Sequence, residues 1–205
     1  DASGDKVHRI DPADDQVVAT VGVGEDPHYV AVNDGAAWVT NVLGGSVTRI
    51  DPATDEVVAT IETDIGALHV VEAQGSVWVT NSLSASVSRI DRRTNEVVAT
   101  IDVASSPHAH AFAAGSVWVG TESGWLSRID PGTNRATIVD GADFDSIDMT
   151  VDGDDIWVAD GTQGTVVRFD AASASVTAKI DLLEFGDCET FRNEAVTPPD
   201  QPSSV

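Results

Sequence analysis

The chain has 205 residues, and 34 Asp and Glu against 11 Lys and Arg give it a formal charge of −23. That length suffices for one substantial core, so we expect a single domain. A chain this acidic would repel a phosphate backbone, which argues against nucleic acid as a partner. No apolar run approaches the roughly 20 residues of a membrane-spanning helix, so we expect no membrane insertion.

The composition leaves source and compartment open. Lys6 and Lys179 are the two lysines, and Asp outnumbers Glu. Adaptation to salt or secretion would explain this bias, and so would a GC-rich genome that depletes Lys. Cys188 is the single cysteine, so no intrachain disulfide can form and cysteine usage does not identify the compartment. The chain begins at Asp1, which we interpret as processing or as the start within a longer precursor.

Three short motifs recur with a period of about 40 residues. The first is Arg-Ile-Asp, with Phe replacing Ile in its last copy, and its steps are 40, 40, 39 and 40 residues from Arg9 to Arg49, Arg89, Arg128 and Arg168. The second begins with Trp-Val at Trp38, Trp78, Trp118 and Trp157. The third is Val-Val-Ala-Thr, at 17–20, 57–60 and 97–100, with a looser copy at 175–178.

Within one period the apolar residues alternate over short runs, which is the period of strands. In 26–62 the predicted strands are Tyr29–Asn33, Ala37–Asn41, Val47–Asp51 and Val57–Ile61, separated by Gly, Asn, Asp and Ser. Four short antiparallel strands in about 40 residues are typical of a β-propeller blade, so the predicted fold class is all-β, a β-propeller of four-stranded blades.

Blade packing assigns structural roles to the repeated residues. A small twisted sheet has two apolar faces and hides both only by stacking against its neighbours. We therefore predict that the four repeated tryptophans pack between blades. The Arg of each triplet is expected to pair with a carboxylate, and its Asp is expected to cap the following turn.

The sequence resembles a known family. Pro-His-x-Val-Ala-Val, Trp-Val-Thr-Asn and Val-x-Arg-Ile-Asp-Pro-x-Thr-x-Glu-Val-Val-Ala-Thr-Ile are similar to the YVTN-repeat β-propellers, which are secreted or surface-layer proteins. The resemblance covers 1–181 and implies a secreted, cell-surface or periplasmic location. That family is defined by its blade framework, and its members differ in what they bind.

The family's strand order divides the chain into a propeller over 1–185 and a tail. Complete blades are expected at 26–62, 66–102, 106–140 and 146–181, with a partial blade at 1–22. The tail, 186–205, is expected to be a closing strand or a disordered linker, since its prolines disfavour a second strand. Two arrangements remain: an imperfectly closed five-bladed ring, or part of a larger ring completed by more chain or a partner subunit.

The loops at one end of the channel are the predicted binding face. They carry the entries to the innermost strands and the connections between second and third strands. Trp125 stands where other units have Ser or Thr, which indicates function or a plug for a one-residue deletion. The predicted binding residues for a protein or small ligand are His28, Tyr29, Leu83, His108, His110 and Trp125.

The sequence does not favour a metal site. The histidines at 28, 108 and 110 could bind a metal or an anion, although repeated histidines are more often framework. Acidic residues crowd 140–155, but in so acidic a chain a solvated surface is favoured over a calcium site. We predict no metal and no cofactor.

Three functions are compatible with the sequence. The favoured one is a non-catalytic binding or scaffolding module, because no nucleophile–base pair or phosphate-binding loop is found. The blades are also similar to virginiamycin B lyase-like propellers, which implies a metal-assisted lyase with His28 or His108 as base; only Asp160 could replace that family's metal-holding Glu. The third is a partner of a redox protein.

Overall fold

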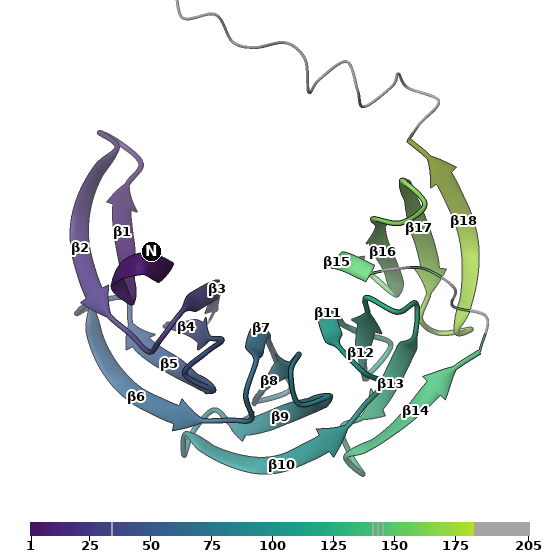
Figure 1. The fold of residues 1–205 in the computed structure, drawn as a ribbon, viewed down its shortest axis with the longest axis horizontal. Coiled ribbons are helices and arrows are strands. Elements are labelled where there is room, and N and C mark those ends of the chain that lie inside the picture. The colour runs from purple at the N-terminus through teal and green to yellow at the C-terminus, as the bar shows by residue number, and fades with distance from the viewer. Residues whose placement is uncertain (34, 141, 143, 145, 183–205) are drawn as a thin grey trace, which may run out of the picture.

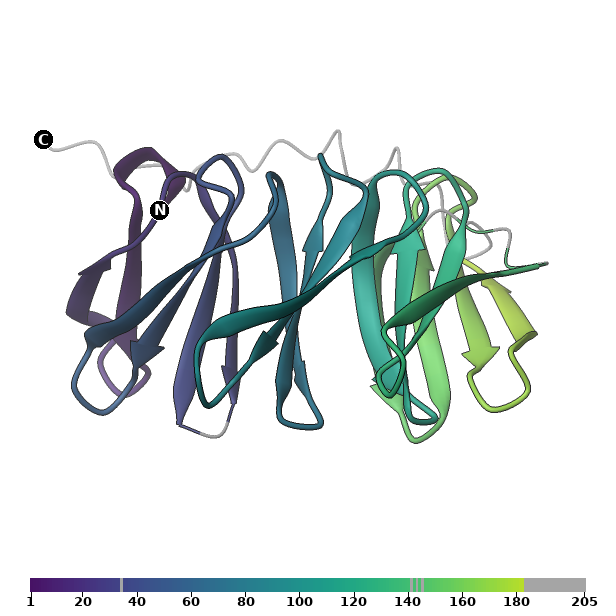
Figure 2. The same ribbon diagram turned by 90° about the horizontal axis from the view of Figure 1, so that it is seen from below.

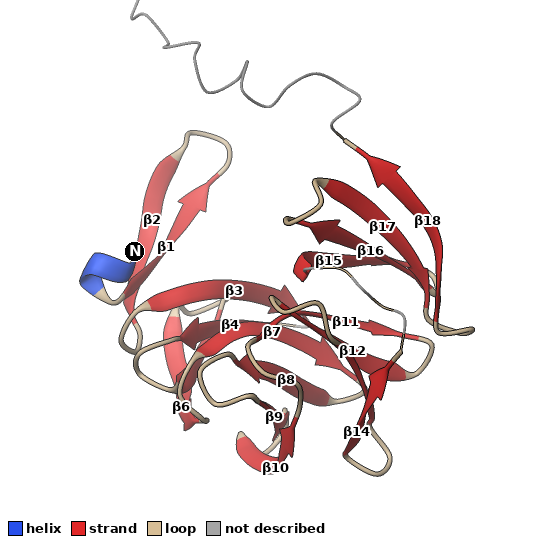
Figure 3. Cartoon of the chain, turned by 45° about the vertical axis from the view of Figure 1, so that its right-hand side comes forward, coloured by secondary structure: helices blue, strands red, loops and turns tan. Residues whose placement is uncertain are grey.

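The structure, a computed structural model, describes residues 1–33, 35–140, 142, 144 and 146–182. It is all-β, as predicted: apart from a single 3-10 turn, η1 (Ala2–Gly4), its elements are strands joined by turns and loops (Figure 3). No helix in the described residues is long and apolar enough to cross a membrane. The predicted tail, 186–205, lies outside the described residues.

In the described residues, eighteen strands form five antiparallel sheets in chain order. A two-stranded sheet comes first, with β1 (Lys6–Asp11) and β2 (Gln16–Gly22). The four sheets that follow have four strands each: β3 (Pro27–Asn33), β4 (Ala36–Asn41), β5 (Ser46–Asp51) and β6 (Glu56–Glu62); β7 (Ala67–Ala73), β8 (Ser76–Asn81), β9 (Ser86–Asp91) and β10 (Glu96–Asp102); β11 (Pro107–Ala113), β12 (Ser116–Thr121), β13 (Leu126–Asp130) and β14 (Arg135–Val139); β15 (Ser146–Asp152), β16 (Asp155–Asp160), β17 (Thr165–Asp170) and β18 (Ser175–Asp181).

The sheets stand side by side in an open arc (Figure 1). The first strand of each four-stranded sheet, β3, β7, β11 or β15, lies on the concave side, and the last strand lies on the convex side. Hairpin turns and loops gather at the two rims of the arc (Figure 2). The described sheets do not close into a ring.

Repeated turn chemistry builds the third hairpin of each sheet. Asp51 Oδ1 accepts a hydrogen bond from Ala53 N at 2.8 Å, and Asp91 and Asp130 cap their turns in the same way, as predicted. Asp170 Oδ1 caps its turn by accepting from Ser173 N, three residues further on. The last turn residue before the outer strand has a left-handed backbone, with φ of 59° at Asp55 and 60° at Asn95. Asp and Asn tolerate that conformation, so the sequence pattern determines this turn.

Tryptophan fills each space between neighbouring four-stranded sheets. Trp38 packs with Val77 and Val79 of the next sheet, and Trp78 packs with Val117 and Val119 in the same way. Trp118 forms the third such contact, with Val158. All three indoles are at most 1% exposed. Their burial confirms the predicted packing role.

Trp157 departs from that prediction. Its side chain is only partly buried, and it lines a small apolar hollow of about 200 Å³ on the last sheet. The physical reason is its position, because the other three indoles are covered by the sheet that follows theirs. No described sheet follows β15–β18.

Three of the repeated arginines, Arg9, Arg49 and Arg89, donate hydrogen bonds to a backbone oxygen of the next sheet. In the four-stranded sheets each guanidinium stacks on its own sheet's tryptophan, as Arg49 does over Trp38 at 5.1 Å. Arg49 Nη1 also donates to Arg92 O at 2.9 Å and to Asn95 Oδ1 at 2.8 Å in the next sheet. Arg9 does pair with a carboxylate, that of Asp55, at 2.8 Å. Arg168 also pairs with a carboxylate, that of Asp155 in its own sheet. The prediction of a carboxylate partner is therefore right for Arg9 and Arg168 and wrong for Arg49.

Candidate functional site

A β-bulge near the start of the inner strands positions the candidate site. The pairing of β3 with β4 shifts between Pro27 and Val30, so that His28 and Tyr29 together lie opposite Thr40. The equivalent shift in β7 lies between Ala67 and Val70. A bulge bends its strand and re-aims the side chains at the extra residue. Both residues of each pair can therefore reach the concave side.

Threonine hydroxyls hold these bulges and join adjacent inner strands. Thr40 Oγ1 accepts from Tyr29 N at 3.0 Å and donates to Leu68 O of the next sheet at 2.8 Å. Thr80 Oγ1 repeats the arrangement, accepting from His69 N and donating to His108 O, both at 3.2 Å. These bonds fix the spacing between β3, β7 and β11 at the point where the aromatic side chains lie.

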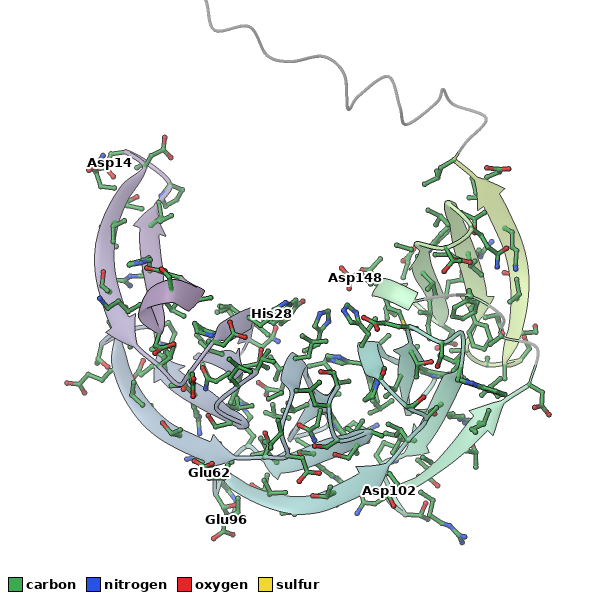
Figure 4. All side chains as sticks on the ribbon, in the orientation of Figure 1. Asp14, His28, Glu62, Glu96, Asp102 and Asp148 are labelled. Atoms are coloured by element: carbon green, nitrogen blue, oxygen red, sulfur yellow. The ribbon has the colours of Figure 1, made fainter. Side chains whose placement is uncertain are left out.

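Four histidines and one tyrosine meet on the concave side, and we call them the histidine cluster: His28, Tyr29, His69, His108 and His110. His69 is at the centre. Its ring centroid is 4.6 Å from that of Tyr29, with nearly parallel planes, and 5.1 Å from that of His108. The cluster lies on the same concave side as Asp148 of β15 (Figure 4).

Burial keeps the two innermost imidazoles uncharged at neutral pH. Loss of hydration, followed by the nearby His108, lowers the pKa of His69 to about 4. Burial and the neighbouring His69 lower the pKa of His110 to about 3, against a hydrogen bond with the Val70 backbone that raises it. His110 Nδ1 is enclosed and has no hydrogen-bond partner among the described residues.

A cleft of about 360 Å³, the inner cleft, opens beside the cluster. Tyr29, His69 and His110 contribute to its lining. Its other walls come from Val70–Glu72 of β7, Ala111 and Phe112 of β11, and Asp148–Val151 of β15. This volume falls in the range of small-molecule sites, and such sites typically combine apolar walls with a few polar groups.

Residues 3–187 match a family described as Domain of unknown function (DUF5074). The chain belongs to this family. No curated protein matches the chain. Among solved structures it is similar to "Kuenenia stuttgartiensis Hydrazine Synthase", with a TM-score of 0.68 and 18% sequence identity over 75% of this chain. The DUF5074 chain spans about half (48%) of that structure's chain, and identity at this level shows likeness of fold alone.

The structure brings four of the six predicted binding residues together. His28, Tyr29, His108 and His110 are all in the histidine cluster, each within reach of His69. His69 is the residue that the predicted set lacks. The 40-residue repeat could have identified His69, because it aligns with Tyr29, a residue of the predicted set, and with Ala109.

The other two predicted residues lie in rim loops. The side chains of Leu83 and Trp125 are 68% and 50% exposed. Trp125 closes a tight loop through reciprocal bonds with Thr121, backbone N to Oγ1 and backbone O to backbone N. Half of its side chain is exposed, so it does not serve as a buried plug, and neither residue lines the inner cleft.

The second-strand ends, which the lyase interpretation would need for a cation, are buried framework positions. Asn41 donates from Nδ2 to Ser46 and Thr48, at 3.1 and 3.0 Å. Asp160 is 2% exposed, and its Oδ1 accepts from the backbone N–H groups of Thr162 and Gln163. In the described residues no three His, Cys, Asp or Glu side chains are arranged to hold a metal ion.

Proposed function

We propose that this DUF5074 domain is a non-catalytic binding module and that a small organic ligand occupies the inner cleft. The observation that carries the proposal is the convergence of four of the five histidines, with Tyr29, beside one cleft. Neutral imidazoles can both donate and accept hydrogen bonds, and aromatic rings give contact area at a low entropic cost. Both are properties of a recognition site.

Histidine NMR signals provide the test, because the chain has five histidines and one of them, His8, lies on β1, away from the cluster. We would screen a fragment library at pH 7.5 and follow the ring C–H signals. Binding in the cleft should shift the His69 and His110 signals and leave His8 unchanged. The variant His69→Gln should weaken binding by about tenfold or more, as loss of a buried hydrogen-bonding ring implies.

His8→Gln is the matched control. His8 Nδ1 bonds Thr20 Oγ1 at 3.0 Å, so this change also removes a ring and one hydrogen bond. It should leave fragment affinity unchanged. If no fragment shifts the cluster signals, or if His69→Gln binds every hit as tightly as the unchanged protein, the inner cleft is not the binding site.

We further propose that the sheets are blades of a β-propeller and that another sheet covers the Trp157 face. Support comes from the arc of equivalent sheets, the likeness of fold to hydrazine synthase, and the resemblance of the repeat to YVTN propellers. The extra sheet would come from more of the chain or from a partner subunit. Small-angle X-ray scattering in the presence of that component should fit a closed ring, and a profile fitting the open arc would contradict it.

The secreted, cell-surface or periplasmic location remains a proposal that rests on the resemblance to surface-layer propellers. Fractionation of the source cells provides its test. Recovery of the protein in the cytoplasmic fraction alone would overturn it.

A further inference from the structure

We propose that the inner cleft selects organic cations, that is, ligands with an ammonium or guanidinium group on an aromatic or apolar body. This inference rests on the proposed function, because it names the ligand class of the same cleft. Its support comes from three features of the lining: the sign of its charges, the protonation state of its imidazoles and the chemistry of its walls.

All charged side chains that line the cleft are acidic. Asp148 and Glu72 contribute carboxylates, and the lining contains no Lys or Arg. The carboxylate of Glu72 forms an ion pair with Arg92, whose Nε is 2.8 Å from Oε1. Its second oxygen, Oε2, is buried and has no partner among the described residues. Asp148 is exposed on the concave side, opposite His28 (Figure 4). Because no basic side chain in the lining offsets the charge of Asp148, its field attracts a cation and disfavours an anionic ligand.

The imidazoles do not cancel this negative field. Because burial holds the pKa of His69 and of His110 well below 7, both rings are neutral at physiological pH. Their ring nitrogens can act as hydrogen-bond donors or acceptors for a ligand without adding positive charge to the cleft.

The walls fit the body of such a ligand. Val70, Val71 and Met149 give apolar surface, and Phe112 and Tyr29 present aromatic rings. A cation over an aromatic face gains about 0.5–2 kcal/mol, depending on how far it is desolvated. An alkyl or aryl group would bury the apolar wall at the same time. A compact hydrated metal ion would use neither feature.

The overall charge of −23 would also attract cations, but that attraction is not specific to one site. It falls with ionic strength over a Debye length of about 8 Å at 0.15 M salt. Selectivity that persists at this salt and maps to the cleft therefore has to come from the lining itself. The experiment separates the two contributions through salt and through matched charge variants.

The probes are three compounds of similar size and different charge: 2-phenylethylammonium, 2-phenylethanol and 3-phenylpropanoate. Each is titrated into the protein at pH 7.5 and 0.15 M salt, with affinity from calorimetry and location from the His69 and His110 ring signals. We expect the cation to bind at least about tenfold more tightly than the alcohol. The carboxylate should not shift the cluster signals.

Asp148→Asn should reduce the advantage of the cation over the alcohol by about threefold to tenfold, because it removes one carboxylate and keeps the size of the side chain. Its matched control is Asp14→Asn, which changes the global charge equally at the exposed tip of the β1–β2 hairpin (Figure 4). The control should leave that advantage unchanged. Equal effects of the two variants would mean that the preference is global and would overturn the inference.

Failure of this inference is distinguishable from failure of the proposed function. If the alcohol or the carboxylate shifts the cluster signals as strongly as the cation, the cleft binds ligands but does not select cations. If none of the three probes does so and fragments of another class do, the cation inference is again wrong and the proposed function stands. If neither these probes nor any fragment reaches the cluster, both fall.

Discussion

Replacing Trp118 by Ala should lower the free energy of unfolding by about 3–5 kcal/mol, the usual cost of deleting a large buried aromatic side chain. The indole is fully buried between two sheets, contacts Phe169 edge to face at 5.1 Å, and donates from Nε1 to Ala113 O at 3.0 Å. Its loss leaves a cavity and an unpaired carbonyl. Urea unfolding followed by far-ultraviolet circular dichroism measures the change.

Trp157→Ala is the matched control for that loss. Trp157 occupies the equivalent position and carries the equivalent stacked arginine, Arg168 at 5.8 Å, but no described sheet covers it. We expect a loss below about 2 kcal/mol, since less surface returns to water. Trp78→Ala should behave like Trp118→Ala. Equal losses at positions 118 and 157 would show that packing between sheets is not the main source of the stability.

The strand framework could be predicted from the sequence because local chemistry determines it. Strand 29–33 was predicted and β3 begins two residues earlier, at Pro27. The Asp-capped turn after β5 starts at Asp51 in both descriptions. Alternating apolar residues and turn residues act within a few positions, so one repeat suffices to find them. The different exposure of Trp157 could not be found in this way, because it depends on a neighbouring sheet.

The candidate site was predictable in part. Residues at equivalent positions of the repeat occupy equivalent places in their sheets. His28, His108 and their neighbours were therefore predicted to lie on the same side. His69 was left out of the predicted binding set, although Tyr29, at the equivalent position of the repeat, was in it. The bulge puts two residues of each inner strand opposite one threonine, so the next position also reaches the concave side. A bulge depends on strand pairing, which the repeat alone does not specify.

The positions of the rim-loop residues depend on contacts that cannot be read from the sequence repeat. Gly66 has φ of +89°, and a Cβ there would lie 2.4 Å from Leu83 N. Close contact between the β6–β7 connection and the β8–β9 hairpin loop therefore places Leu83, which was predicted at the site by repeat position alone. The structure brings the strand residues of the site together, while the loop residues follow loop packing.

Lowering the pH from 7.5 to 5 should destabilise the fold through the histidine cluster. The pKa of His69 is lowered on folding, so between pH 6.5 and 4 the unfolded chain binds the proton and the folded chain does not. This stability is fully present above pH 6.5 and falls as the pH drops towards 4. For His69 alone the loss at pH 5 is about 2 kcal/mol, and His110, with its pKa near 3, adds a similar amount.

A variant comparison isolates this contribution, because titrating carboxylates also change stability in a chain of charge −23. Urea unfolding is measured at pH 7.5 and 5 for the unchanged protein and for the double variant His69→Gln/His110→Gln, in which the amides do not titrate. The carboxylates contribute equally to both proteins, so the difference between their two pH shifts belongs to the imidazoles. We expect the unchanged protein to lose about 2–4 kcal/mol more than the variant. Equal shifts would mean that folding does not lower the pKa of these two rings.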